Sequence, residues 1–162
     1  MYPKVYQWQG IIFLLYLVGS LFVINDATAD ILITKLDDVD AMATPGREND
    51  LTLTERLCIG SNPAGPFSLR ATGSGIGGRF TIENGPYAIP FATYIQDRVS
   101  GGSFMSINPG IPVTGLRARS LNPNNRCRGN PTQVRIVFSN LSFSGAPAGI
   151  YRGTLQLSVI PE

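Results

Sequence analysis

Glycine and proline interrupt this chain too often for long helices to form. The 162 residues include 18 Gly and 12 Pro, about one residue in five, whereas these two types make up about one residue in eight of an average protein. Proline removes a backbone donor and glycine carries a high entropic cost when its conformation is fixed, so both residues end helices and mark turns. The sequence therefore predicts many short strands joined by turns.

Between the turns, apolar and polar residues alternate with the period of two that is typical of half-buried strands. The clearest alternation lies in residues 151–159, near the end of the chain. Asn84-Gly85 has the composition of a hairpin turn. Further strands are expected at 31–36, 51–59, 67–71, 80–82, 89–96, 111–116 and 134–138. About seven strands at this spacing predict an all-β fold, an antiparallel β-sandwich.

The first 29 residues have the features of a secretory signal peptide. Lys4 supplies a basic start, residues 11–24 form an apolar run of 14, and Ala27-Thr28-Ala29 is an A-x-A cleavage site. A transmembrane helix needs about 20 apolar residues, so we favour cleavage between Ala29 and Asp30 over an uncleaved membrane anchor. Residues 30–162 contain no second run of sufficient length. We therefore expect one secreted domain with no stable membrane span after cleavage.

Cys58 and Cys127 are the only two cysteines of the chain. Secretion places them in an oxidising compartment, where a disulfide is the expected state. The alternative is a reactive thiol, but no His and no C-x-x-C pair is present to activate one. We predict a disulfide between Cys58 and Cys127.

The composition excludes several classes of function. The chain has no His and only two Cys, which removes Ser-His-Asp and Cys-His catalysis and both His-ligated and all-Cys zinc sites. A net charge of +2 provides no basic field of the kind that binds nucleic acid. We predict that the protein is not an enzyme, has no catalytic residue, metal site or cofactor, and binds no nucleic acid.

Two local motifs favour ordinary structural explanations. Gly73, Gly75 and Gly78 match G-x-G-x-x-G, but a dinucleotide site requires a helix to follow, and here a strand and a turn are expected. We predict a hairpin loop.

Four arginines surround Cys127, and we favour a solvated loop over a contact with an acidic surface, polysaccharide or nucleic acid, because no aromatic residue lies among them. These arginines are Arg117, Arg119, Arg126 and Arg128.

Four segments together resemble a known family. They are CIGSN at 58–62, RATGSGIGGRFTI at 70–82, IPFATYIQD at 89–97 and PAGIYRGTLQLSVIPE at 147–162. They are similar to the spore coat U (SCPU) family, which includes subunits of archaic chaperone–usher pili. The last segment is the most specific, because a P-A-G-x-Y turn leads into an alternating terminal strand in that family. The resemblance extends over residues 31–162.

The resemblance implies an immunoglobulin-like β-sandwich that lacks its final strand. In such pilins an extended segment of a neighbouring subunit fills the gap by β-strand addition. The alternating terminal strand is compatible with this, because an apolar edge left open is an aggregation hazard. We expect the following residues to line or border the acceptor groove while also belonging to the core: Ile136, Phe138, Leu155, Leu157 and Val159.

The resemblance also implies partners and a location. A periplasmic chaperone, an outer-membrane usher and a neighbouring pilus subunit would be the partners, and the protein would pass through the periplasm to the cell surface. Polymerising pilins carry an N-terminal donor extension, whereas residues 31–40 here resemble the first body strand itself. One departure from the family is Asp40-Ala41, which stands where the family usually has Phe-Gly after the first strand. We therefore expect a minor, adhesive subunit at the pilus tip that accepts a strand and gives none.

Two other functions stay open at this point. The protein could be a free-standing secreted binding module, for example a carbohydrate-binding sandwich, or a spore or cell coat protein. A binding module folds alone and usually displays aromatic rings for sugar stacking. Residues 30–162 contain no Trp, and their only tyrosines are Tyr87, Tyr94 and Tyr151.

Overall fold

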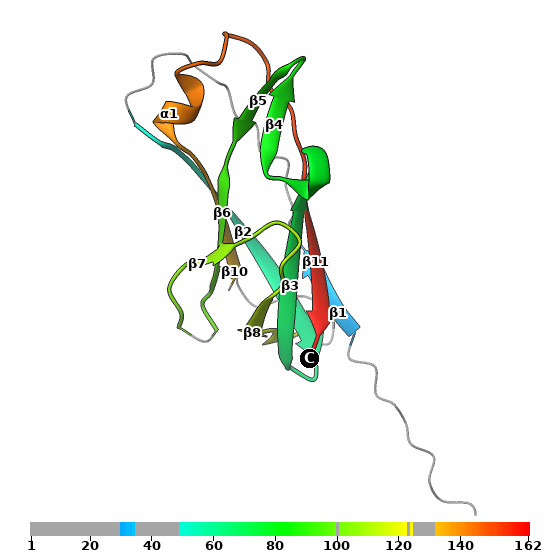
Figure 1. Ribbon diagram of the computed structural model, residues 1–162. Helices are drawn as coiled ribbons and strands as arrows, with labels where there is room; N and C mark the ends of the chain where they lie inside the picture. The colour runs from blue at the N-terminus through cyan, green and yellow to red at the C-terminus, as the bar shows by residue number, and fades with distance from the viewer. Residues whose placement is uncertain (1–29, 35–48, 100, 123, 125–131) are drawn as a thin grey trace, which may run out of the picture.

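The computed structural model describes residues 30–34, 49–99, 101–122, 124 and 132–162, which form an all-β fold (Figure 1). Two short helical turns, η1 (Ile76–Gly78) and α1 (Asn140–Phe143), are the helices of this part of the chain. The strands are β1 (Asp30–Thr34), β2 (Leu51–Asn62), β3 (Pro66–Gly73), β4 (Thr81–Asn84), β5 (Tyr87–Pro90), β6 (Ala92–Asp97), β7 (Met105–Ile107), β8 (Val113–Arg117), β9 (Arg119–Ser120), β10 (Thr132–Phe138) and β11 (Leu155–Pro161). The predicted all-β class is confirmed.

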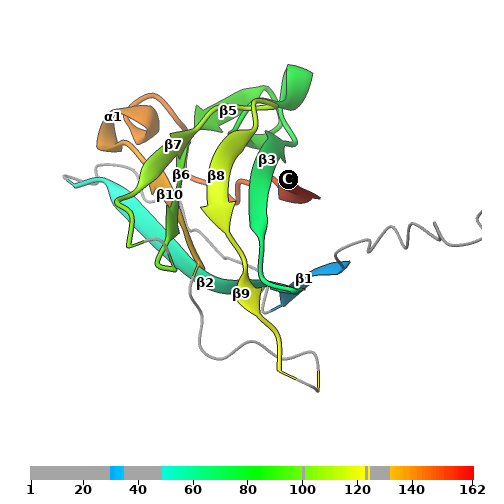
Figure 2. The same ribbon diagram turned by 90° about the horizontal axis from the view of Figure 1, so that it is seen from below.

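The strands form two main sheets and one hairpin. The first sheet has the order β1-β2-β10-β6-β7, with β9 beside the end of β2, and the second has the order β11-β3-β8. All described strand pairs are antiparallel except β2 with β9. Figure 2 shows the second sheet facing the long strand β2 of the first. The hairpin β4-β5 is present, but its turn residues are Gly85 and Pro86, one position after the predicted Asn84-Gly85, because Asn84 pairs with Tyr87 as the last residue of β4.

The order of the strands is that of an immunoglobulin-like sandwich. In that fold, strands A, B, E and D form one sheet, and strands C, F and G form the other. Taken in chain order, β1, β2, β3, β6, β10 and β11 correspond to A, B, C, D, E and F, because β1-β2-β10-β6 are neighbours in one sheet and β3-β11 in the other. Strand G, which pairs with the free side of F, has no counterpart among the described residues.

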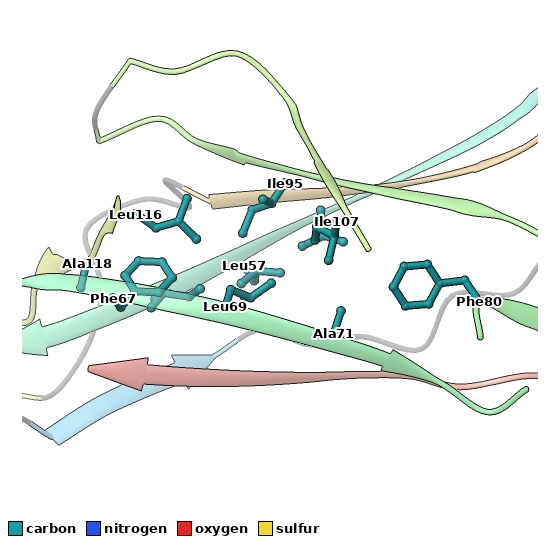
Figure 3. Close-up of a cluster of buried hydrophobic side chains, with 11 residues drawn as sticks. Leu57, Phe67, Leu69, Ala71, Phe80, Ile95, Ile107, Leu116 and Ala118 are labelled. Carbon is teal, nitrogen blue, oxygen red and sulfur yellow. The ribbon is translucent and has the colours of Figure 1, made fainter. Parts of the chain in front are cut away.

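Two apolar clusters fill the space between the sheets. The first joins β2, β3, β6 and β8, and Figure 3 shows Leu57, Phe67 and Leu69 pointing into it. The second lies at the α1 end of the molecule and contains Phe138 and Phe143. The strand residues of both clusters follow from period-two alternation, which places every second residue of a strand on the inner face of its sheet.

Phe91 connects the two clusters and divides one predicted strand. The sequence predicts one strand over 89–96, in which Pro90 favours an edge or a strand start, whereas the structure has β5 and β6 on either side of Phe91. The Phe91 ring stacks on Phe80 at 5.5 Å between ring centroids and lies 5.2 Å from the ring of Phe138. A side chain that packs against both clusters requires the chain to turn there, so tertiary packing interrupts the strand.

The glycine motif joins two sheets rather than closing a hairpin. It connects β3, which pairs with β11 and β8, to β4, which pairs with β5, so the predicted hairpin loop is wrong. A Cβ on Gly73 would collide with the backbone oxygen of Arg79, and Gly78 has a φ of 78°, which favours glycine. The motif is therefore explained by a close backbone approach and a left-handed turn.

Candidate functional site

The outer edge of β11 has no strand partner within the described part of the chain. On its inner side, β11 pairs with β3 along its whole length, from Leu155 opposite Gly73 to Pro161 opposite Phe67. β11 is the end strand of its sheet. An unpaired edge presents a row of backbone N–H and C=O groups that can pair with another strand. This edge is therefore the candidate functional site.

The side chains of β11 that face the core are incompletely covered. Leu155, Leu157 and Val159 pack against the first cluster but are only partly buried. Leu69 and Ala71, which stand opposite Val159 and Leu157 on β3, are 0% exposed. The difference arises because β3 has a strand on each side, whereas β11 has a described strand on one side only. An added strand would cover the three partly exposed side chains.

Strand β1 lies close to β11 on this open side (Figure 1). Its Ile33 is also a partly buried residue that packs against the first cluster. The sequence does not distinguish Ile33 as a groove residue, because it ends an unbroken apolar run with Ile31 and Leu32. The described apolar side chains that pack against the first cluster at this edge are thus Ile33, Leu155, Leu157 and Val159.

The two remaining predicted groove residues lie on β10 in the other sheet. Phe138 is 2% exposed and packs in the second cluster against Phe143, with 5.9 Å between their ring centroids. Ile136 is partly buried and packs against the same cluster, together with Leu51 and Leu53 of β2. The structure therefore brings Leu155, Leu157 and Val159 together on one strand and places Ile136 and Phe138 with a different cluster.

Alternation alone did not find where the last strand begins. The sequence predicts a strand from residue 151, whereas β11 begins at Leu155. Tyr151 is buried in the second cluster, and its hydroxyl donates a hydrogen bond of 3.0 Å to the carbonyl oxygen of Pro147. A Cβ on Gly153 would press against the backbone of β4 at Thr81 and Ile82. This stretch packs against the β4-β5 hairpin, and only then does the chain join β3.

The remaining predicted site residues are placed as follows. Cys58 is buried in β2 and is not a free thiol, but Cys127 lies outside the described residues, so their pairing stays a prediction. The proposed cleavage between Ala29 and Asp30 lies at the start of the described chain and is also untested. Arg117 and Arg119 are exposed, but they lie on strands β8 and β9 and not in the predicted loop. Arg126 and Arg128 lie outside the described residues.

One buried carboxylate has a structural role that the sequence did not indicate. Asp97, at the end of β6, is 1% exposed. Its carboxylate oxygens accept hydrogen bonds of 2.8 Å from the backbone N–H groups of Val99 and Arg117. A buried carboxylate is stable when backbone donors satisfy it. Asp97 therefore ties the β6-β7 connection to β8. Its contact with Val99 is local, whereas its contact with Arg117 joins residues 20 positions apart, so no local motif reveals it.

The described residues contain neither a metal cluster nor a membrane-spanning helix. No group of three or more Asp, Glu or Cys side chains is placed there to hold a metal ion. None of the helices in this part of the chain has the length and apolar character needed to span a membrane. Comparison of the sequence with models of known families and with curated proteins gives no match.

Proposed function

We propose that this protein is a structural subunit of a chaperone–usher type surface pilus, which accepts a β-strand from a neighbouring subunit at the outer edge of β11. One observation carries the proposal: β11 is an end strand whose inward side chains Leu155, Leu157 and Val159 are only partly covered. Strand addition would supply backbone hydrogen bonds along the edge, and alternate side chains of the donor would cover the apolar row.

The topology supports the same proposal. The described strands fill the A, B, C, D, E and F positions of an immunoglobulin-like sandwich. The vacant position beside β11 is that of strand G. A donor strand from another chain would complete the sheet there and remove an exposed edge that otherwise promotes aggregation.

The proposal includes the partners expected from the sequence resemblance. A periplasmic chaperone would occupy the β11 edge after export, and an outer-membrane usher would exchange the chaperone for the strand of a neighbouring subunit. A position at the pilus tip, with an adhesive role, belongs to the same proposal. It rests on the resemblance of residues 31–40 to a first body strand.

The test completes the sheet within a single chain. The full precursor is exported to an oxidising periplasm, either unchanged or with an Asn-Gly turn and an alternating Thr-Val strand appended after Glu162. The appended strand is expected to raise soluble yield and to raise Tm by more than about 10 °C, because several kcal/mol correspond to a shift of that size in a domain of this length. Thermal unfolding by circular dichroism measures the shift.

Two controls make the result specific. In the first, prolines replace the valines of the appended strand, which removes backbone donors and is expected to abolish the gain. In the second, Leu157→Arg on the core-facing side of β11 should block the gain, whereas Ser158→Arg on the opposite side of the same strand should not. A high Tm without the appended strand, together with no gain on adding it, would contradict the proposal.

A further inference from the structure

One carboxylate lies on the core-facing side of the long strand β2. From Leu51 to Leu57 the residues of β2 alternate between exposed and less exposed positions, and Glu55 is at a less exposed one, on the same face as Leu53 and Leu57. In the strand register Glu55 stands beside Val134 of β10, which is 3% exposed and belongs to the first cluster. Leu57 belongs to the first cluster and Leu53 packs against the second. A charged side chain therefore interrupts the apolar row between the two clusters.

The Glu55 carboxylate has no hydrogen-bond or ion-pair partner in the part of the chain that the structure describes. The arginines of β2 and β10, Arg56 and Arg135, occupy the alternate positions of their strands and thus lie on the opposite face of the sheet. Burial of a carboxylate without a partner is costly, whereas a half-buried carboxylate such as that of Glu55 keeps its contact with water. Any strand that covers Glu55 must therefore satisfy its charge.

Glu55 lies toward the same side of the sandwich as the outer edge of β11. β1 pairs with β2 from Cys58 to Asn62, so from Leu51 to Leu57 the only described strand beside β2 is β10. The side of β2 without a described strand there is the side on which β1 lies, and β1 is close to β11. A strand added at the β11 edge would therefore cover both the apolar row of β11 and the face of β2 that carries Glu55.

These observations define the chemistry of the strand that fits. An apolar donor side chain over Glu55 would remove water from the carboxylate and leave a buried charge unpaired, which is costly. The ammonium of a lysine or the guanidinium of an arginine would instead keep the charge paired as water is excluded. We propose that the donor strand accepted at β11 carries a lysine or arginine among its core-facing residues, and that this residue pairs with Glu55. The inference rests on the proposed strand addition and deepens it, because Glu55 then selects which strands are accepted.

The test varies the core-facing residues of the appended strand one at a time. The full precursor with the Asn-Gly turn and the alternating Thr-Val strand after Glu162 is exported to an oxidising periplasm, and each valine is replaced singly by lysine, glutamine or glutamate. At one position we expect Tm to be highest with lysine and lowest with glutamate, and lysine to exceed glutamine by about 5 °C, the size expected for one charge-assisted hydrogen bond. At the other positions all three replacements should lower Tm relative to valine, because they bury a polar group without a partner.

Substitution of Glu55 assigns the preference to this carboxylate. Glu55→Gln keeps the size of the side chain and removes its charge, so the advantage of lysine over glutamine in the appended strand should fall below about 1 °C, as in a double-mutant cycle. The strand that contains only valine at its core-facing positions should raise Tm more in Glu55→Gln than in the unchanged protein, because it no longer buries a charge. Glu83→Gln, which replaces an exposed glutamate of β4, is the matched control and should leave the advantage of lysine unchanged.

The possible results separate this inference from strand addition itself. If no appended strand raises Tm, strand addition at β11 fails and the pairing with Glu55 fails with it. If the valine strand raises Tm but lysine has no advantage over glutamine at any position, strand addition stands and the pairing with Glu55 is wrong. An advantage of lysine that persists in Glu55→Gln would also overturn the pairing, because another group would be responsible. The comparison of lysine, glutamine and glutamate needs no substitution in the core, so it decides the proposal even if Glu55→Gln does not fold.

Discussion

Strands β3 and β11 are direct neighbours with the same alternating pattern, yet they differ in how completely they are buried. Leu69 and Ala71 of β3 are 0% exposed, whereas Val159 and Leu157, which stand opposite them on β11, are only partly buried. β3 has strands on both sides, and β11 has a described strand on one. Alternation therefore determines which face of a strand is apolar, and the neighbouring strands determine how completely that face is buried.

The largest effect is expected in the central strand. Leu69→Ala removes a fully buried side chain from the first cluster and should lower the free energy of unfolding by about 3 kcal/mol, since the cavity adds to the lost transfer energy. Urea denaturation measures the change, with an unchanged m-value as evidence that the unfolding transition is comparable. A loss below about 1 kcal/mol would mean that this site is not the close-packed centre of the core.

A smaller effect is expected for a leucine of the edge strand β11. Leu157→Ala should lower the free energy of unfolding of the unmodified protein by about 1 kcal/mol, because the Leu157 side chain is already partly in water. In the variant with the appended strand, the same substitution should cost about 2 to 3 kcal/mol, because the side chain is then fully covered. An equal cost for Leu69→Ala and Leu157→Ala in the unmodified protein would remove the difference between the strands.

The smallest effect is expected on the opposite side of β11. Ser158 is exposed, so Ser158→Thr should change the free energy of unfolding by no more than about 0.5 kcal/mol. The same urea titrations provide the measurement. A loss above about 1 kcal/mol would indicate that something already covers the outer side of this strand.

Several features of the fold could be predicted because they depend on short stretches of sequence. The strands β3, β10 and β11 follow from alternation, and turn chemistry places a hairpin within one residue of the observed turn at Gly85 and Pro86. At the break between β5 and β6, Pro90 favours an edge or a strand start, but the packing of Phe91 depends on the rings of Phe80 and Phe138 and could not be predicted. Alternation favoured one continuous strand there.

The candidate sites show the same division. Leu155, Leu157 and Val159 were predicted together because they share one face of one strand. Glu55 was not marked as part of a site, since its lack of a described strand neighbour on one side depends on where β1 pairs with β2. Asp97 was likewise unmarked, because its donors are backbone N–H groups, one of them from Arg117.

The sequence by itself determined that the chain forms strands, which residues of β11 face inward, and, to within one residue, where the β4-β5 hairpin turns. Only the tertiary structure decided that β11 is an end strand, that Phe91 joins two clusters, and that β1 pairs with the part of β2 beyond Glu55. The reason is physical: alternation and turn preference act between residues close in sequence, whereas coverage and stacking depend on the order in which distant strands pair.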